Sequence, residues 1–179
     1  WMPWMPPRLT RAGTSTAKSA GTPGTYPPRL GMFTMNVHGR SQAIDSMIAE
    51  CFEPDEWQTG RLPKAKTGYW WVAFDGKIPA AFACLRPSIR SEHTGYLAMS
   101  GVLQKWRGQG LQRKLIRKRV AHARHLGWHT VITDTINHNA ASMRSLIACG
   151  FRPYLPAVRW GDPAHAVYWT RSTEPRLSV

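Results

Sequence analysis

The stretch KWRGQGLQRKL, residues 105–115, is the most informative part of this chain. Gly108 and Gly110 flank a glutamine behind Arg107, and a helical pattern of leucines begins directly after them. A glycine turn that opens a helix brings unpaired backbone N–H groups and the positive end of the helix dipole to one point. Phosphate binds well at such a point, so the stretch predicts an anion-binding turn. It matches neither the Walker loop nor the dinucleotide GxGxxG fingerprint.

The residues on either side of the turn predict alternating strands and helices. TGYLAMSGV at 94–102 predicts a strand, and residues 111–126 place their leucine, isoleucine, valine and alanine side chains on one side of an amphipathic helix. The β-branched residues 129–136 predict another strand. Residues 139–151 predict a second helix, which ends at a glycine.

The outer parts of the chain complete this pattern. We expect a strand at 33–37, a helix at 41–52, a hairpin at 69–85 that turns at Asp-Gly-Lys, and a terminal hairpin formed by residues 155–160 and 164–170. The order is strand, helix, hairpin, strand, helix, strand, helix, hairpin. This order indicates an α/β or α+β fold with a mixed sheet.

Composition limits the class of protein. The 179 residues fit one domain, and the formal net charge of +14 favours a polyanionic partner. The cysteines Cys51, Cys84 and Cys149 form no CxxC pair and have no histidines at metal spacing, which indicates reduced, buried thiols in an intracellular, cytoplasmic protein without a metal site. The sequence has no run of about eighteen apolar residues, so we expect no membrane partner.

The first 31 residues differ in composition from the rest. They are rich in Pro, Gly, Ser and Thr, and no acidic residue occurs before Asp45. We therefore expect a basic arm or leader at 1–31 and one folded domain at 32–179. The arm resembles an organelle transit peptide or a disordered tail. Alternatively, it lies on a nucleic acid or on a neighbouring subunit of a larger organelle or virion assembly.

A second motif about thirty residues after the glycine turn suggests a family. The pattern Val102-x4-RGQGL, a helix, a β-branched strand, and then Asn139-x2-Ser142-x7-Gly150-Phe151 resembles the GNAT superfamily of acyl-CoA-dependent N-acyltransferases. The resemblance covers residues 69–151. It implies a mostly antiparallel mixed sheet flanked by helices. It also implies transfer of an acetyl group from acetyl-CoA to an amine, although the acceptor itself is not identified.

The resemblance also implies a set of residues that bind CoA. The amides of 109–112 would take the pyrophosphate, and a nearby Lys or Arg the 3′-phosphate. A bulge would splay the strand that ends at Val102 from strand 131–136, so that the pantetheine pairs like an added strand and the main chain of 101–103 polarises the thioester. Asn139 would hold the pantetheine or cap its helix. The implied set is Val102, Leu103, Arg107, Gly108, Gln109, Gly110, Leu111, Gln112, Asn139 and Ser142.

Two positions depart from the family pattern. Gln112 stands where Gly or Ala is frequent, and Leu146 stands where a tyrosine often protonates the CoA thiolate. Tyr168 or solvent would have to replace that donor. Candidates for the general base are Glu50, Glu92 and His93, each of which also suits an ordinary surface position, so the sequence assigns no catalytic residue.

The region 105–125 is unusually basic, because no acid occurs between Glu92 and Asp134. It is either a solvated helix face that partly neutralises CoA, or a contact for RNA, DNA or another polyanion. Three functions follow: an N-acetyltransferase, which we favour; a catalytically inactive GNAT-fold component of a large ribonucleoprotein or virion assembly; or a plain nucleic-acid-binding domain. The basic residues of the region are Lys105, Arg107, Arg113, Lys114, Arg117, Lys118, Arg119 and Arg124.

Overall fold

The structure, a computed structural model, describes residues 34–38, 42–52, 68–161 and 164–174. The chain divides into two units, Trp1–Leu30 and Gly31–Val179. All described residues belong to the second unit, and the arm expected at 1–31 lies outside them.

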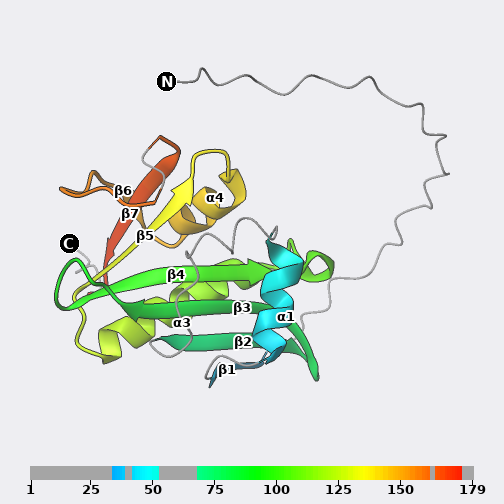
Figure 1. Cartoon of the computed structure of the whole chain (residues 1–179). Helices are drawn as coiled ribbons and strands as arrows, with labels where there is room; N and C mark the ends of the chain where they lie inside the picture. Colours follow the sequence, from blue (N-terminus) through cyan, green and yellow to red (C-terminus); the bar gives the residue numbers. More distant parts are fainter. Residues whose placement is uncertain (1–33, 39–41, 53–67, 162–163, 175–179) are drawn as a thin grey trace, which may run out of the picture. The chain divides into compact units, whose positions relative to one another are not determined.

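The described strands form one seven-stranded sheet in the order β1-β2-β3-β4-β5-β7-β6 (Figure 1). Among these strands, only β4 and β5 run parallel, and every other neighbouring pair is antiparallel. The expected mostly antiparallel mixed sheet is confirmed. The strands are β1 Thr34–His38, β2 Tyr69–Asp75, β3 Ile78–Pro87, β4 Thr94–Val102, β5 Thr130–Ile136, β6 Arg152–Pro153 and β7 Ala166–Ser172.

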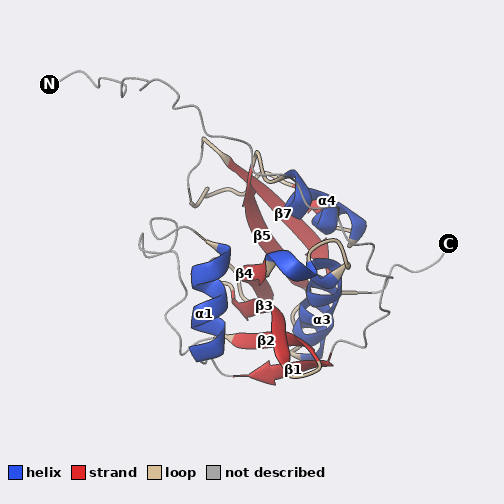
Figure 2. Cartoon of the chain, turned by 90° about the vertical axis from the view of Figure 1, so that its right-hand side faces the viewer, coloured by secondary structure: helices blue, strands red, loops and turns tan. Residues whose placement is uncertain are grey.

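Helices cover both faces of this sheet. Helix α1, Gln42–Cys51, lies on one face of β2–β4, and helix α3, Leu111–His125, lies on the other (Figure 2). A short 3-10 helix, η1 at Gln104–Trp106, precedes α3, and α4, Ala140–Ala148, packs beside α3. Helix α1 buries Ile44, Met47 and Ile48, as the period of its apolar residues predicts.

The buried face of α3 contains one residue that the apolar pattern does not predict. Arg119 is only 2% exposed, and its guanidinium donates to the carbonyls of Leu115 (3.3 Å) and Cys84 (3.1 Å). Burial lowers the pKa of Arg119 to about 10, so it stays charged at neutral pH. Arg119 therefore ties α3 to β3 and does not belong to the basic surface, whereas Leu126, expected on the apolar side, is only half-buried.

The terminal hairpin differs from the expectation. The segment 155–160 is not a strand; β6 is the short piece Arg152–Pro153, which pairs with Thr170 and Trp169 of β7. Pairing with β7 continues past Pro153, since the Tyr154 N–H donates to the Tyr168 carbonyl (3.0 Å), but Pro156 inside the segment has no N–H to donate. The strand expected at 164–170 is present, shifted to Ala166–Ser172.

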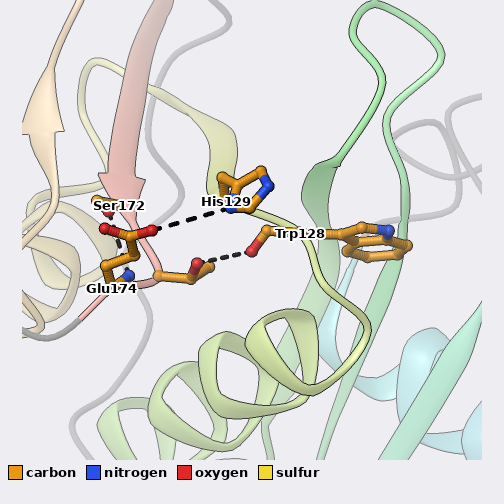
Figure 3. Close-up of polar contacts among 5 residues, drawn as sticks. Trp128, His129, Ser172 and Glu174 are labelled. Atoms are coloured by element: carbon orange, nitrogen blue, oxygen red, sulfur yellow. Dashed lines mark hydrogen bonds and ion pairs between the residues drawn. The ribbon is translucent and has the colours of Figure 1, made fainter.

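Hydrogen bonds join the end of β7 to the segment that connects α3 with β5 (Figure 3). The Thr173 hydroxyl donates to the Trp128 carbonyl (2.6 Å), and the Thr173 N–H donates to the His129 carbonyl (3.0 Å). His129 Nδ1 lies 4.0 Å from Glu174 Oε1, and the Glu174 N–H donates to the Ser172 hydroxyl (3.2 Å). We call this part of the sheet, where β4 and β5 also pair, the closed end.

Candidate functional site

Strands β4 and β5 part after only three paired residues. Thr94–Tyr96 pairs with Thr130–Ile132, and no further β4–β5 pair forms within the described residues. In Figure 1 the two strands start side by side and then diverge. We call the diverging part, 99–102 of β4 and 134–136 of β5, the open end. In this part the two strands do not pair with each other, so an extended ligand can pair with the main-chain groups that face between them.

A bulge causes the divergence. Leu97 pairs with Leu85 and Met99 pairs with Cys84, so Ala98 is an extra residue in β4. The Thr133 hydroxyl donates to the Leu97 carbonyl (2.8 Å) at the fork and fixes the point of separation. The bulge that the family resemblance implied in this strand is therefore present.

The glycine turn leaves the start of α3 open. Gly108 and Gly110 have φ values of 80° and 73°, a left-handed conformation that favours glycine. A Cβ at either position would meet nothing within 4 Å, so the space in front of the turn is free. The first helical bond joins the Lys114 N–H to the Gly110 carbonyl (3.1 Å), and no described side chain caps the helix. The amides of 111–113 can therefore bind an anion.

Bonds to the sheet hold this turn in place. The Trp106 indole N–H donates to Asp75 Oδ2 (3.1 Å), and Arg107 Nε donates to the Val102 carbonyl (3.0 Å). The Leu103 N–H donates to the Ala80 carbonyl (3.0 Å). Within the predicted segment 101–103, the Val102 carbonyl and the Leu103 amide are therefore already bonded inside the protein.

Other residues of the predicted CoA set have distinct positions. Gln109 is exposed on the turn, whereas the Leu111 side chain is only 1% exposed, which leaves only its amide for a ligand. Gln112 Nε2 donates to the Ser100 hydroxyl (2.8 Å) and so connects α3 with β4. This bond gives Gln112 a structural role at the position where the family often has Gly or Ala.

Asn139 caps α4 at the end of the connection from β5. Its Oδ1 accepts a hydrogen bond from the Ser142 N–H (3.0 Å), which confirms the capping role. Asn139 is exposed and Ser142 is half-buried. A contact of either residue with the pantetheine stays a prediction.

The position of the family tyrosine is apolar in this chain. Leu146 is 4% exposed and packs in the core. The Tyr168 hydroxyl donates to the Trp160 carbonyl (2.7 Å) and accepts from the Trp160 N–H (3.1 Å). Both hydrogen bonds of Tyr168 therefore hold the segment after β6, and they occupy the hydroxyl that could have replaced the missing donor.

Asp134 is the carboxylate that the structure brings to the open end. Its Oδ1 accepts from the Tyr96 hydroxyl (2.6 Å) and from Trp160 Nε1 (2.7 Å). No described group donates to Oδ2, so this oxygen can accept a proton. Burial, and then the charge of Asp134, raise the pKa of Tyr96, so the phenol stays protonated and keeps donating.

The carboxylate lies on the face of the sheet opposite to α3. A Cβ on Gly95 would lie 2.7 Å from the Trp128 ring, which follows α3, so position 95 faces that helix. Side chains alternate along a strand, so Tyr96 points to the other face and brings Asp134 with it. The site thus has two sides: the N-terminus of α3 on one face and Asp134 on the other.

The candidate bases proposed from sequence lie apart. Glu92 and His93 form the turn before β4, at the closed end. Glu50 is exposed on α1 next to Cys51, and a Cβ on Gly101 in the open end would lie 2.7 Å from the Cys51 Sγ, so of the three candidates Glu50 comes near the open end. Sequence reasoning missed Asp134. The available signal was an acid inside the strand TVITDTI, because charged residues are uncommon in strand interiors.

The other side chains of possible chemical interest are few. Cys51, Cys84 and Cys149 form no disulfide within the described part of the chain; Cys51 is half-buried, not buried, and burial raises the pKa of Cys51 and Cys149. Among the described residues, no three His, Cys, Asp or Glu side chains are grouped to hold a metal ion. None of the helices in the described ranges is both long and apolar enough to cross a membrane.

The split sheet, the glycine turn and the uncapped helix define the class of acyl-CoA N-acyltransferase folds. A model of the Acetyltransferase (GNAT) family matches residues 41–151, and the chain belongs to this family. A search of curated protein sequences finds no match.

Solved structures agree with this assignment. A GNAT family acetyltransferase from Elizabethkingia anophelis with acetyl-CoA bound is 16% identical, with a TM-score of 0.61 over 78% of this chain and 97% of that one. A Bacillus subtilis acetyltransferase in complex with CoA is 14% identical (TM-score 0.62; 78% and 98%). The Escherichia coli ribosomal-protein-S18-alanine N-acetyltransferase is 13% identical (TM-score 0.60; 82% and 100%). At these identities the likeness shows the fold.

Proposed function

We propose that this chain transfers an acetyl group from acetyl-CoA to an amine. The observation that carries the proposal is the open end, where a broken strand pair, the uncapped start of α3 and the Asp134 carboxylate come together. Membership of the GNAT family supports it. The acetyl-CoA and CoA bound to the Elizabethkingia and Bacillus proteins support the choice of cosubstrate.

The residues at the open end suit the parts of acetyl-CoA. The free space before Gly108 and Gly110 and the amides of 111–113 suit the pyrophosphate, and exposed Lys105 and Arg107 suit the 3′-phosphate. The unpaired edge of β4 after Ala98 suits the pantetheine amides. When bound, acetyl-CoA supplies an activated acyl thioester.

Asp134 would prepare the amine for attack. An ammonium group must lose a proton before it becomes a nucleophile, and Asp134 Oδ2 can accept that proton. Tyr96 and Trp160 orient the carboxylate by holding Oδ1. We assign no side chain to protonation of the leaving thiolate, because Leu146 is apolar and the Tyr168 hydroxyl is engaged, which leaves this proton to water.

The test is an assay of thiol release with the full chain, acetyl-CoA and a mixed set of primary amines. We expect thiol release that depends on amine, and an acetylated amine by mass spectrometry. Failure to bind acetyl-CoA would contradict the proposal. Binding without transfer to any amine would instead favour the inactive structural component expected as the alternative, which the comparisons do not support.

We also propose a nucleic-acid contact on the exposed face of α3. Every exposed Lys, Arg, Asp or Glu side chain on this helix is basic: Arg113, Lys114, Arg117, Lys118 and Arg124. Since a helix rises about 1.5 Å per residue, Arg124 lies roughly 20 Å from the glycine turn, beyond the pyrophosphate that the turn suits. A solvated helix face ordinarily mixes both charge signs.

Fluorescence anisotropy with labelled RNA and DNA tests this contact. Arg117→Glu combined with Arg124→Glu is expected to weaken binding and to reduce its salt dependence. Lys77→Glu, on the exposed β2–β3 turn, is the control and should bind more tightly than the double variant. Equal binding by the two variants would remove α3 from the contact.

A further inference from the structure

The side chains around Asp134 indicate the chemistry of the acceptor. We propose that the acceptor is an amine that also carries an anionic group, a carboxylate or a phosphate. The inference rests on the proposed function, because it names the substrate class of the same site. It comes from two arginines whose guanidinium groups lie over the two rings that bond Asp134.

Aromatic rings surround the carboxylate. The Trp160 ring lies 4.5 Å from the Tyr168 ring, 6.4 Å from the Tyr96 ring and 6.5 Å from the Tyr154 ring, measured between centroids. We call these four rings the aromatic cluster. They come from β4, from β7 and from the segment between β6 and β7, so the fold brings distant parts of the sequence together around Asp134.

Each ring that donates to Asp134 carries a guanidinium group on its face. The Arg86 guanidinium carbon lies 4.9 Å from the centroid of the Tyr96 ring, and that of Arg90 lies 4.8 Å from the Trp160 ring. Neither arginine forms an ion pair with a carboxylate of a described residue. The ion pair that the described residues do form joins His129 and Glu174.

A guanidinium group held over a ring is well prepared to bind an anion. Neither guanidinium group donates a hydrogen bond to a described residue, so its N–H donors are available to a carboxylate or phosphate, which the guanidinium fork can bind with two hydrogen bonds. The ring also restricts the arginine side chain before a ligand arrives, which reduces the entropy lost on binding. Arg90 is exposed and Arg86 is half-buried, so solvent reaches the region that they border.

The balance of charge selects the acceptor. The Asp134 carboxylate and the two guanidinium groups over its ring partners carry a summed charge of +1, so these three groups together do not favour a simple ammonium ion. An amine that carries an anionic group presents its ammonium to Asp134 and its anion to Arg86 and Arg90. The alternative, in which the two arginines only cover the rings, predicts no preference for an anion.

Two matched pairs of amines test the proposal: β-alanine against propylamine, and O-phosphoethanolamine against ethanolamine. We expect the member that carries the anionic group, in at least one pair, to have a kcat/KM about tenfold or more above the partner that lacks it. Substitution of both arginines, Arg86→Met with Arg90→Met, should reduce that ratio about tenfold. Lys77→Met removes one exposed cation from the β2–β3 turn and should keep the ratio.

The pair that shows the preference identifies the anion as a carboxylate or a phosphate. Equal or better use of propylamine and ethanolamine, which lack the anionic group, by the native protein overturns the proposal, as does a preference that survives the double substitution.

A binding measurement separates this proposal from the function on which it rests. By calorimetry, we would titrate O-phosphoethanolamine, β-alanine, ethanolamine and propylamine into the native protein and into the double variant, with and without CoA. Tighter binding of an anionic amine that is lost in the double variant supports the proposal even if no acetyl transfer occurs, in which case the proposed function alone fails. Equal binding of amines with and without the anionic group overturns the proposal.

Discussion

The two ends of β4 differ in what holds them, although they belong to one strand. At the closed end, Thr94–Tyr96 pairs with β5, and Thr173 bonds the end of β7 to the segment before β5. At the open end, the same two strands face each other without pairing, beside an uncapped helix and a carboxylate with one free oxygen. The two strands thus pair with each other at one end and leave their facing main-chain groups unpaired with each other at the other end.

The difference teaches that the binding edge is made by a small defect in regular structure. A single extra residue, Ala98, separates the strands, and the Thr133 hydroxyl joins them at the last point before they part. At the closed end, the pairing of Thr94–Tyr96 with Thr130–Ile132 holds the two strands together. The predictions below change one end at a time.

The largest effect is expected from Asp134→Asn at the open end. An amide cannot accept the proton of an ammonium group, so kcat/KM for acetyl transfer should fall about 10²- to 10⁴-fold. The affinity for acetyl-CoA, measured by calorimetry, should be unchanged. Glu92→Gln at the closed end is the matched control and should leave the rate unaltered; equal losses in both variants would remove Asp134 from the base role.

Thr133→Val should loosen the fork itself. Leu97 is only 4% exposed, so its carbonyl would lose its partner without gaining water, at a cost of about 1–3 kcal/mol in the free energy of unfolding. Urea titration measures this loss. We also expect weaker acetyl-CoA binding, since the two strands would no longer separate at a fixed point; unchanged affinity would show that the hydroxyl does not set the binding edge.

Thr173→Val should have a smaller effect, confined to stability. The Trp128 carbonyl that loses the hydroxyl belongs to a half-buried residue, where water can replace the bond, so the expected cost is about 0.5–1.5 kcal/mol. The affinity for acetyl-CoA should match the native protein. A loss of affinity like that of Thr133→Val would mean that the two ends are coupled.

The smallest effect concerns pH and His122, which packs against Tyr69 and Trp71 near the closed end. Burial, and then the charge of His125, lower the pKa of His122 below its ordinary value of 6.5, and its buried Nε2 has no partner among the described residues. Because the pKa of His122 is lower in the folded chain, the unfolded chain binds a proton first as pH falls. The contribution of His122 to the free energy of unfolding is therefore fully present above pH 6.5 and is lost as pH falls through the pKa of the folded state. Urea midpoints should fall with pH in this range, and His122→Phe should flatten the decline.

Local patterns in the sequence account for most of the fold. The helix at 111–126, the strand at 129–136 and the hairpin at 69–85 follow from periodicity and turn residues, and the structure confirms them within two residues. Arg119 was hidden, because a single charge within a run of basic residues gives no sign of its burial. The strand expected at 155–160 is absent, and Pro156 within it removes a donor that a ladder needs.

The candidate site was only half accessible to sequence reasoning. The glycine turn and the Asn139 cap are local features, and both are recognisable from neighbouring residues. The Asp134 arrangement is not local, since its partners Tyr96 and Trp160 are 38 and 26 residues away in the chain. The bulge at Ala98 also has no local mark, because TGYLAMSGV resembles any regular apolar strand.

The central claim, that acetyl-CoA binds at the open end, is tested most directly by calorimetric titration of three proteins. Gly110→Asp and Gly127→Asp each put a carboxylate at a left-handed glycine beside α3, the first at the open end and the second near the closed end. We expect micromolar binding by the native protein and by Gly127→Asp, and none by Gly110→Asp, with thermal unfolding showing that all three are folded. Undiminished binding by Gly110→Asp, or no binding by the native protein, would contradict the account.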